Sequence, residues 1–169
     1  MTLELLHNFN VWKSTVEVPL DIKDNIYALQ QRDPGNTKSN YGGWHSTSWS
    51  HIKKYSGRDW SWICPTMDKL LTIVSTKWDY PFDRGWFNIN KFGDSNNWHH
   101  HGKHPIVSVF YIQVPEDSGP IEFRKDGETF MYKPQNGDYV IFPGDLEHRV
   151  IESTSVEDRI SMAVNFAKV

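Results

Sequence analysis

The N-terminal part of the chain carries apolar residues at the spacing of two amphipathic helices. In residues 20–31, Ile22, Ile26 and Leu29 recur three or four positions apart, which places them on one helix face. A second stretch begins near Pro65, a residue type that fits the first turn of a helix. Its longer apolar stripe consists of Met67, Leu70, Leu71, Val74 and Trp78. We expect both stripes to pack against a core rather than to form binding grooves.

After Tyr80 the pattern changes to short β-rich runs separated by turn residues, whereas residues 33–43 predict a loop. The predicted strands are 86–92, 106–114, 121–124, 129–132, 139–142, 148–152 and 159–166. Many short strands indicate a sandwich or barrel, and helices that precede them should pack on its outside. We therefore expect a mostly β fold in one domain, 1–169. Residues 1–80 would form a helical support and loop region, and 81–169 the barrel core.

Strand alternation assigns a direction to the last predicted strand, 159–166. Ile160, Met162, Val164 and Phe166 share one face, while Arg159, Ser161, Ala163 and Asn165 share the other. The apolar face should meet the helices, so the second face would point into the barrel, although a solvent-exposed face is the alternative. In 86–92 the same alternation groups Asn88 and Asn90 with Trp86, either on the cavity wall or on an edge strand.

Composition and charge limit the function classes. The 169 residues have a net charge of −3 and no basic stripe, so nucleic-acid binding through charge is not expected. No apolar run approaches the ~18 residues that span a bilayer. The N-terminus shows no leader pattern. The single cysteine, Cys64, predicts a packed thiol in a reducing compartment. These features favour a cytoplasmic protein.

Histidines form the main candidate for chemistry. If residues 99–101 are extended, His99 and His101 point to the same side and can hold one metal ion. His148 begins a strand after a Pro-Gly turn, roughly 47 residues later, and is the best candidate for a third ligand. Three ligands on one side leave open positions, as in non-heme Fe(II) oxygenases. The alternative is a surface histidine run that binds metal adventitiously.

Arg159 follows His148 by eleven residues and is the candidate anion-binding group. A guanidinium at a strand end can hold a carboxylate through two hydrogen bonds, as a dicarboxylate cosubstrate would require. Ser161, on the same face, can donate a further hydrogen bond. The alternative for Arg159 is an ion pair with one of three nearby carboxylates, Asp145, Glu157 or Asp158.

Several segments form an ordered pattern between residues 39 and 166. They are Ser39–Ser46, Trp86–Gly93, Trp98–His101, Val107–Pro115, Phe142–Val150 and Arg159–Phe166. In this order they resemble the small 2-oxoglutarate/Fe(II)-dependent oxygenase family of bacteria and phages, within the prolyl-hydroxylase-like superfamily. The corresponding family motifs read SNxGGWxS, WxN, HxH, SxVYYL…P, FPxxLxHxV and RxSxxFN, the last with a spacing that differs by one residue here.

The resemblance implies a double-stranded β-helix, or jelly roll, with Fe(II) at one mouth and 2-oxoglutarate as cosubstrate. It implies a hydroxylase of a small molecule or peptide that decarboxylates 2-oxoglutarate to succinate. The metal positions would be His99, His101 and His148. The cosubstrate positions would be Arg159, Ser161, Tyr111 and Asn90.

One departure concerns His101, because most members of the superfamily have Asp or Glu at that position. Three neutral imidazoles leave the full charge of Fe(II) at the site, which changes anion affinity. A carboxylate such as Asp94 could instead be the ligand, and His104 is a further alternative.

Two other functions fit parts of the pattern. Gly137, Pro143 and His148 resemble the second cupin motif, so a three-histidine dioxygenase without 2-oxoglutarate is possible, but it leaves Arg159 and Ser161 unexplained. A non-catalytic jelly roll that stacks sugar rings on its aromatics is the third hypothesis. Substrate identity and oligomeric state are not predicted.

Overall fold

The computed structural model describes residues 2–50 and 60–169, and within them the chain forms two helices and twelve strands. The helices are α1 (Ile22–Gln30) and α2 (Cys64–Ser75). The strands are β1 (Glu4–His7), β2 (Val11–Thr15), β3 (Asn40–Tyr41), β4 (Trp44–His45), β5 (Phe82–Asn90), β6 (Ser95–His99), β7 (Ile106–Gln113), β8 (Ile121–Lys125), β9 (Glu128–Tyr132), β10 (Asp138–Pro143), β11 (Glu147–Val150) and β12 (Arg159–Phe166).

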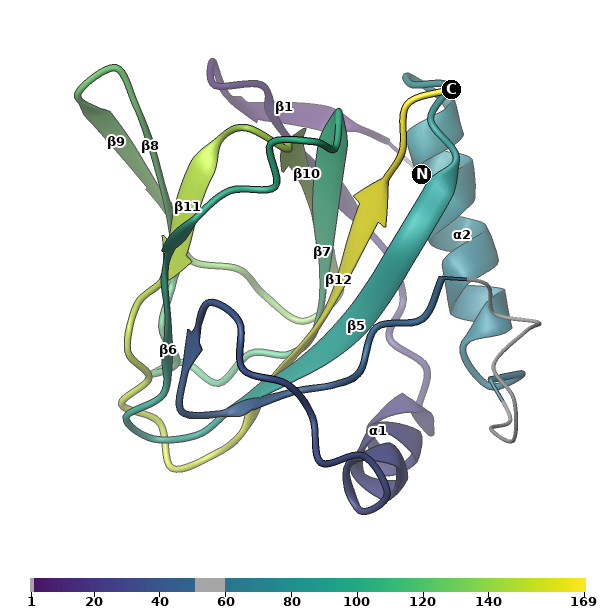
Figure 1. Ribbon diagram of the computed structural model, residues 1–169, viewed down its shortest axis with the longest axis vertical. Helices are drawn as coiled ribbons and strands as arrows, with labels where there is room; N and C mark the ends of the chain where they lie inside the picture. Colours follow the sequence, from purple (N-terminus) through teal and green to yellow (C-terminus); the bar gives the residue numbers. More distant parts are fainter. Residues whose placement is uncertain (1, 51–59) are drawn as a thin grey trace.

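The strands form two antiparallel sheets that face each other (Figure 1). The larger sheet has the order β1-β2-β10-β7-β12-β5-β4, and the smaller has the order β3-β6-β11-β8-β9. Both helices lie on the outer side of the larger sheet. This arrangement is the predicted double-stranded β-helix with flanking helices. Neither helix of the described residues combines the length and apolar content that a membrane span requires.

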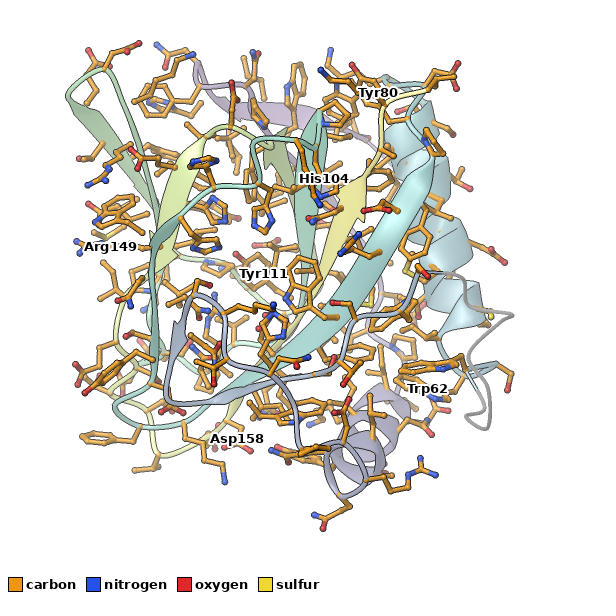
Figure 2. The ribbon with its side chains drawn as sticks, in the orientation of Figure 1. Trp62, Tyr80, His104, Tyr111, Arg149 and Asp158 are labelled. Carbon is orange, nitrogen blue, oxygen red and sulfur yellow. The ribbon has the colours of Figure 1, made fainter. Side chains whose placement is uncertain are left out.

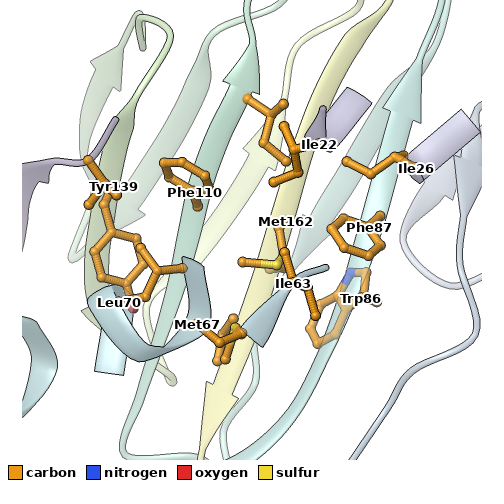
Figure 3. Close-up of a cluster of buried hydrophobic side chains, with 14 of the residues drawn as sticks. Ile22, Ile26, Ile63, Met67, Leu70, Trp86, Phe87, Phe110, Tyr139 and Met162 are labelled. Carbon is orange, nitrogen blue, oxygen red and sulfur yellow. The ribbon is translucent and has the colours of Figure 1, made fainter. Parts of the chain in front are cut away.

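The core between the helices and the larger sheet comes from the two apolar stripes found in the sequence. Figure 3 shows Ile22 and Ile26 of α1, with Met67 and Leu70 of α2, packed beside Met162 of β12. Pro65 lies in the first turn of α2, where its missing N–H is not needed for a hydrogen bond. α2 ends at Ser75, so the predicted stripe residue Trp78 lies beyond the helix, half-buried against the same core. The helix expected at 20–31 agrees with α1 within two residues at each end, whereas the stripe expected for the second helix extends three residues beyond the end of α2.

A second core lies between the two sheets. It contains buried apolar side chains from β7, β8 and β10, among them Val107, Tyr111, Phe123, Val140 and Phe142. Strand β12 lies between the two core regions, because Ile160, Met162, Val164 and Phe166 face the helices. Its alternate residues face the space between the sheets, and the inward direction predicted for 159–166 is confirmed.

Five of the observed strands were missed by the sequence analysis: β1, β2, β3, β4 and β6. β1 and β2 precede the helices, so the prediction that all strands follow them was wrong. β2 pairs with β10 and extends the larger sheet, a long-range contact that residues 4–15 do not reveal. β6 was also missed, because Ser95–His99 is polar throughout. β5 begins at Phe82 rather than at residue 86, and the predicted loop 33–43 includes the two-residue strand β3.

The packed environment expected for Cys64 is seen in part. Cys64 is the first residue of α2 and half-buried, and its Sγ lies 3.5 Å from the carbonyl oxygen of Trp60. With one cysteine in the chain, no internal disulfide is possible.

Candidate metal centre and its cavity

An open cavity of about 680 Å³ lies between the two sheets. Its walls come from β5, β7 and β12 on one side and from β6 and β11 on the other, with residues 38–48 and 100–104 at its edge. Figure 2 shows Tyr111 and His104 inside this space, whereas Arg149 lies on the outer side of the smaller sheet. The cavity is large enough for a small-molecule ligand, since such sites commonly enclose about 300–1,000 Å³.

Three histidines converge on one wall of the cavity. His99 ends β6, His101 follows two residues later, and His148 lies in β11 directly opposite His99 in the sheet register. Their ring centroids are 4.2 Å (His99–His148), 5.2 Å (His99–His101) and 5.4 Å (His101–His148) apart. One potential ligand atom from each ring lies within 4.8 Å of the others. The strand pairing of β6 with β11 therefore assembles the group that the sequence spacing suggested.

Hydrogen bonds orient two of these rings. Nδ1 of His99 lies 2.7 Å from the carbonyl oxygen of Asn97, and Nδ1 of His148 lies 2.9 Å from that of Leu146. A ring whose Nδ1–H donates to a carbonyl presents the lone pair of Nε2 to a metal. The backbone of His101 is held separately, because its N–H donates to the carbonyl oxygen of Gly144 at 2.6 Å.

Asn165 of β12 contacts the third ring. Its Nδ2 lies 3.4 Å from Nδ1 of His101, and its Oδ1 is buried without a hydrogen-bond partner among the described residues. Rotation of the amide by 180° would place Oδ1 beside Nδ1 of His101 and satisfy both groups. In that arrangement Nε2 of His101 would also be free to bind a metal.

Burial keeps all three imidazoles neutral. Desolvation lowers the pKa of His101 to about 3, with a further contribution from repulsion by His99. Desolvation likewise lowers the pKa of His99 and lowers that of His148 well below its usual value. Neutral imidazole is the form that coordinates metals, so these rings need not lose a proton near neutral pH before binding. The donor set therefore fits a divalent transition metal such as Fe(II).

Arg159 lies at the start of β12, buried to 2% exposure on the same cavity. Its guanidinium carbon is 5.2 Å from the centroid of the Tyr111 ring. Nε and Nη2 of Arg159 and the hydroxyl of Tyr111 have no hydrogen-bond partner within the described part of the chain. Desolvation lowers the pKa of Arg159 and raises that of Tyr111 to about 12. A buried cation with unused donors fits an anionic ligand, because an unpaired buried charge is costly.

The other predicted cosubstrate contacts lie around Arg159. Ser161 is buried, lines the cavity and is the register partner of Tyr111 on β7. Asn90 is the register partner of Arg159 on β5, but it does not line the cavity. Its Nδ2 instead donates to Oδ1 of Asn96 at 3.2 Å. Asn88, the other amide predicted for this face, does line the cavity.

The ion pairs proposed as alternatives for Arg159 are not formed among the described residues. Asp158 accepts a hydrogen bond from the hydroxyl of Tyr27 at 2.8 Å instead. Asp94, the alternative metal ligand, accepts from the backbone N–H of Lys91 at 2.7 Å and is not part of the histidine group. His104 also lies apart from this group, with Nδ1 3.1 Å from the carbonyl oxygen of Phe166.

Of three aromatic residues on the strands around the site, Trp86 and Trp98 line the cavity and Phe110 does not. Trp86 lines the cavity and stacks on His101 with centroids 5.8 Å apart. Phe110 packs on the helix side of the larger sheet and faces away from the cavity, as strand alternation in β7 requires. The Trp98 ring lies between the guanidinium groups of Arg124 (4.2 Å) and Arg149 (4.7 Å), whose side chains alternate with the inward-facing residues of the smaller sheet.

The sequence analysis did not single out His45 as a cavity residue. His45 is 6% exposed and stacks on Trp86 at 5.3 Å, so the rings of His45, Trp86 and His101 form one continuous stack. Its Nδ1 lies 2.9 Å from the carbonyl oxygen of Ser46, and desolvation lowers its pKa. The only sequence signal was its place within the matched segment 39–46.

Comparisons with known proteins agree with this geometry. Residues 122–165, which include His148, Arg159, Ser161 and Asn165, match a family model described as "Putative 2OG-Fe(II) oxygenase". Among curated proteins none matches by sequence.

Solved structures share the fold. A prolyl-4-hydroxylase from Pseudomonas putida has 16% identity and a TM-score of 0.65, covering 94% of this chain and 92% of that one. A viral collagen prolyl hydroxylase from Paramecium Bursaria Chlorella virus-1, in its 2-oxoglutarate complex, has 16% identity, a TM-score of 0.64 and coverage of 92% and 96%. A 2OG-Fe(II) oxygenase family protein from Burkholderia pseudomallei has 12% identity, a TM-score of 0.69 and coverage of 92% and 85%.

Proposed function

We propose that this chain is a 2-oxoglutarate/Fe(II)-dependent oxygenase that hydroxylates a small molecule or peptide with decarboxylation of 2-oxoglutarate to succinate. The observation that carries this proposal is the combination in one cavity of three convergent imidazoles and a buried guanidinium with unused donors. Structural neighbours that include prolyl hydroxylases support an organic C–H substrate.

In this proposal His99, His101 and His148 hold Fe(II), and Arg159 with Ser161 holds the distal carboxylate of 2-oxoglutarate. Fe(II) with 2-oxoglutarate would supply the two-electron oxidation by O₂. The chain's own residues fix the geometry: the carbonyls of Asn97 and Leu146 orient two ligand rings, and Trp86 packs against the third. The hydroxyl of Tyr111, whose ring lies 5.2 Å from the guanidinium carbon of Arg159, would donate to the same carboxylate.

The test is succinate formation by purified, untagged protein with Fe(II) and 2-oxoglutarate, together with the Fe(II) absorption spectrum recorded without oxygen. We expect 2-oxoglutarate to change that spectrum in the wild type and in Arg124→Ala, an exposed-arginine control. Arg159→Ala should lose the change while keeping the metal. Absence of metal-linked 2-oxoglutarate binding in the wild type would remove the proposal.

A second candidate is a three-histidine dioxygenase that needs no 2-oxoglutarate. The observation in its favour is the absence of a carboxylate from the histidine group within the described residues. It leaves the unused donors of Arg159 without a role. It would be favoured by Fe(II) binding whose absorption spectrum does not respond to 2-oxoglutarate. The unpaired Cys64 supports a reducing compartment, such as the cytoplasm, for either enzyme.

A further inference from the structure

The charges on the wall of the cavity are all of one sign. Twenty-one residues of the chain are acidic, yet no carboxylate side chain lines the cavity among the described residues. Four cationic side chains do line it: Lys38, Arg84, Lys103 and Arg159. The chain as a whole has a net charge of −3, so this cavity is a local positive region on an acidic protein.

The four cations differ in whether they are already neutralised. Nε of Arg84 is 2.9 Å from Oδ2 of Asp83, which compensates its charge. Arg159 is the group that we assign to 2-oxoglutarate. Lys38 and Lys103 have no ion-pair partner in the part of the chain that the structure describes, and both are exposed at the edge of the cavity. Two cations are therefore left without a counter-charge.

Both lysines lie in segments that are hydrogen-bonded to the chain around His99 and His101. Ser39, next to Lys38, accepts a hydrogen bond from the backbone N–H of Asn97, so this segment is fixed beside β6. Figure 1 shows this dark-blue segment between β6 and β5. Lys103 lies in the turn closed by the hydrogen bond from the N–H of His104 to the carbonyl oxygen of His101. Each lysine is thus close in the chain or the sheet to the group His99–His101.

Fe(II) and 2-oxoglutarate do not neutralise this edge. When three neutral imidazoles are the ligands, the two positive charges of Fe(II) balance the two negative charges of 2-oxoglutarate. The positive charge of Arg159 is then already in excess, so the cosubstrate leaves no negative charge to offset the lysines. Lys38 and Lys103 then leave the edge of the cavity positive even in the loaded enzyme. Such a field concentrates anions and repels cationic substrates.

We propose, resting on the function proposed above, that the primary substrate is an anion whose carboxylate or phosphate group binds Lys38 and Lys103. The reacting carbon then lies toward the three histidines. His45 and Asn88, both on the cavity wall, present uncharged hydrogen-bonding groups to the rest of the molecule.

The experiment uses the full chain loaded with Mn(II) in place of Fe(II) and saturated with 2-oxoglutarate. Mn(II) shortens the NMR relaxation times of nuclei held near it. The probes are inorganic phosphate, observed by ³¹P, acetate, observed by ¹H, and tetramethylammonium as a cation of similar size. We expect saturable relaxation enhancement with phosphate, acetate or both, and none with tetramethylammonium. The comparison of phosphate with acetate identifies which anionic group the edge prefers.

The decisive variant is Lys38→Glu with Lys103→Glu, and its matched control is Lys125→Glu with Lys133→Glu, which changes the net charge equally. Lys125 lies in β8, and Lys133 follows β9 away from the cavity. We expect anion affinity to fall about tenfold or more in the decisive variant and to stay close to wild type in the control. Affinity for 2-oxoglutarate should change much less than affinity for the probe.

Two results would overturn the inference. One is an equal response of the two double variants, which would show that only net charge acts. The other is a loss of 2-oxoglutarate affinity as large as the loss of probe affinity, which would assign the lysines to the cosubstrate. Loss of Mn(II) or 2-oxoglutarate binding in the wild type would instead refute the proposed function itself.

Discussion

Replacement of Arg159 by Met should stabilise the empty protein and abolish its response to 2-oxoglutarate. Arg159 is 2% exposed, and its Nε and Nη2 have no partner among the described residues. Replacing a buried, poorly compensated charge by an apolar side chain of similar length removes a desolvation cost. We expect a gain of about 1–3 kcal/mol in the free energy of unfolding without ligands.

The expected loss of cosubstrate affinity follows from the same two nitrogens. Two charge-assisted hydrogen bonds contribute about 1.5–3 kcal/mol each, so affinity should fall by roughly 10²- to 10⁴-fold. Urea unfolding of the metal-loaded protein, with and without 2-oxoglutarate, measures both effects. At a ligand concentration 100 times Kd the wild type should gain about 2.7 kcal/mol, and Arg159→Met almost nothing.

Arg124→Met is the control, because Arg124 is exposed and pairs with Glu147 at the surface. We expect it to leave the 2-oxoglutarate response unchanged. The reasoning would be refuted if Arg159→Met destabilised the empty protein by more than about 1 kcal/mol, since losses of that size indicate a structural interaction. Retention of the full 2-oxoglutarate response in Arg159→Met would refute it as well.

Three further predictions concern the histidine group. His148→Ala should weaken Mn(II) binding, followed by electron paramagnetic resonance, by at least about 100-fold, whereas the exposed His100→Ala should have little effect; equal effects would exclude a defined site. Asn165→Leu should weaken Mn(II) binding by about 10- to 100-fold, because it removes the side chain beside Nδ1 of His101; unchanged affinity would show that this contact does not orient the ring. Without metal, the free energy of unfolding should fall as the pH is lowered from about 7.5 to about 5.5. The reason is that the pKa of His101 is lowered to about 3 in the folded state, whereas the same ring in the unfolded chain takes up a proton near pH 6.5. For His101 alone the expected loss at pH 5.5 is about 1 kcal/mol. His101→Gln should reduce that slope in urea titrations, and an unchanged slope would count against a buried neutral ring.

Much of the fold was predictable because strand and helix periodicities report locally which residues are buried. The alternation in 159–166 placed Arg159 and Ser161 inside and Met162 outside, as the structure shows. The stripe containing Met67 and Leu70 placed α2 against the sheet for the same reason. Strand β2 could not be predicted this way, because its position depends on pairing with β10, more than one hundred residues later.

For the site, the sequence by itself determined the residue types and their grouping in the chain: the histidines at 99–101 and 148, and the arginine at 159. Only the tertiary structure decided that His148 pairs across the sheet with His99, that Arg159 has no counter-ion among its described neighbours, and that no carboxylate lines the cavity. Each of these facts depends on residues far apart in the chain. Burial and partner choice are properties of packed surfaces, and local sequence periodicity does not specify them.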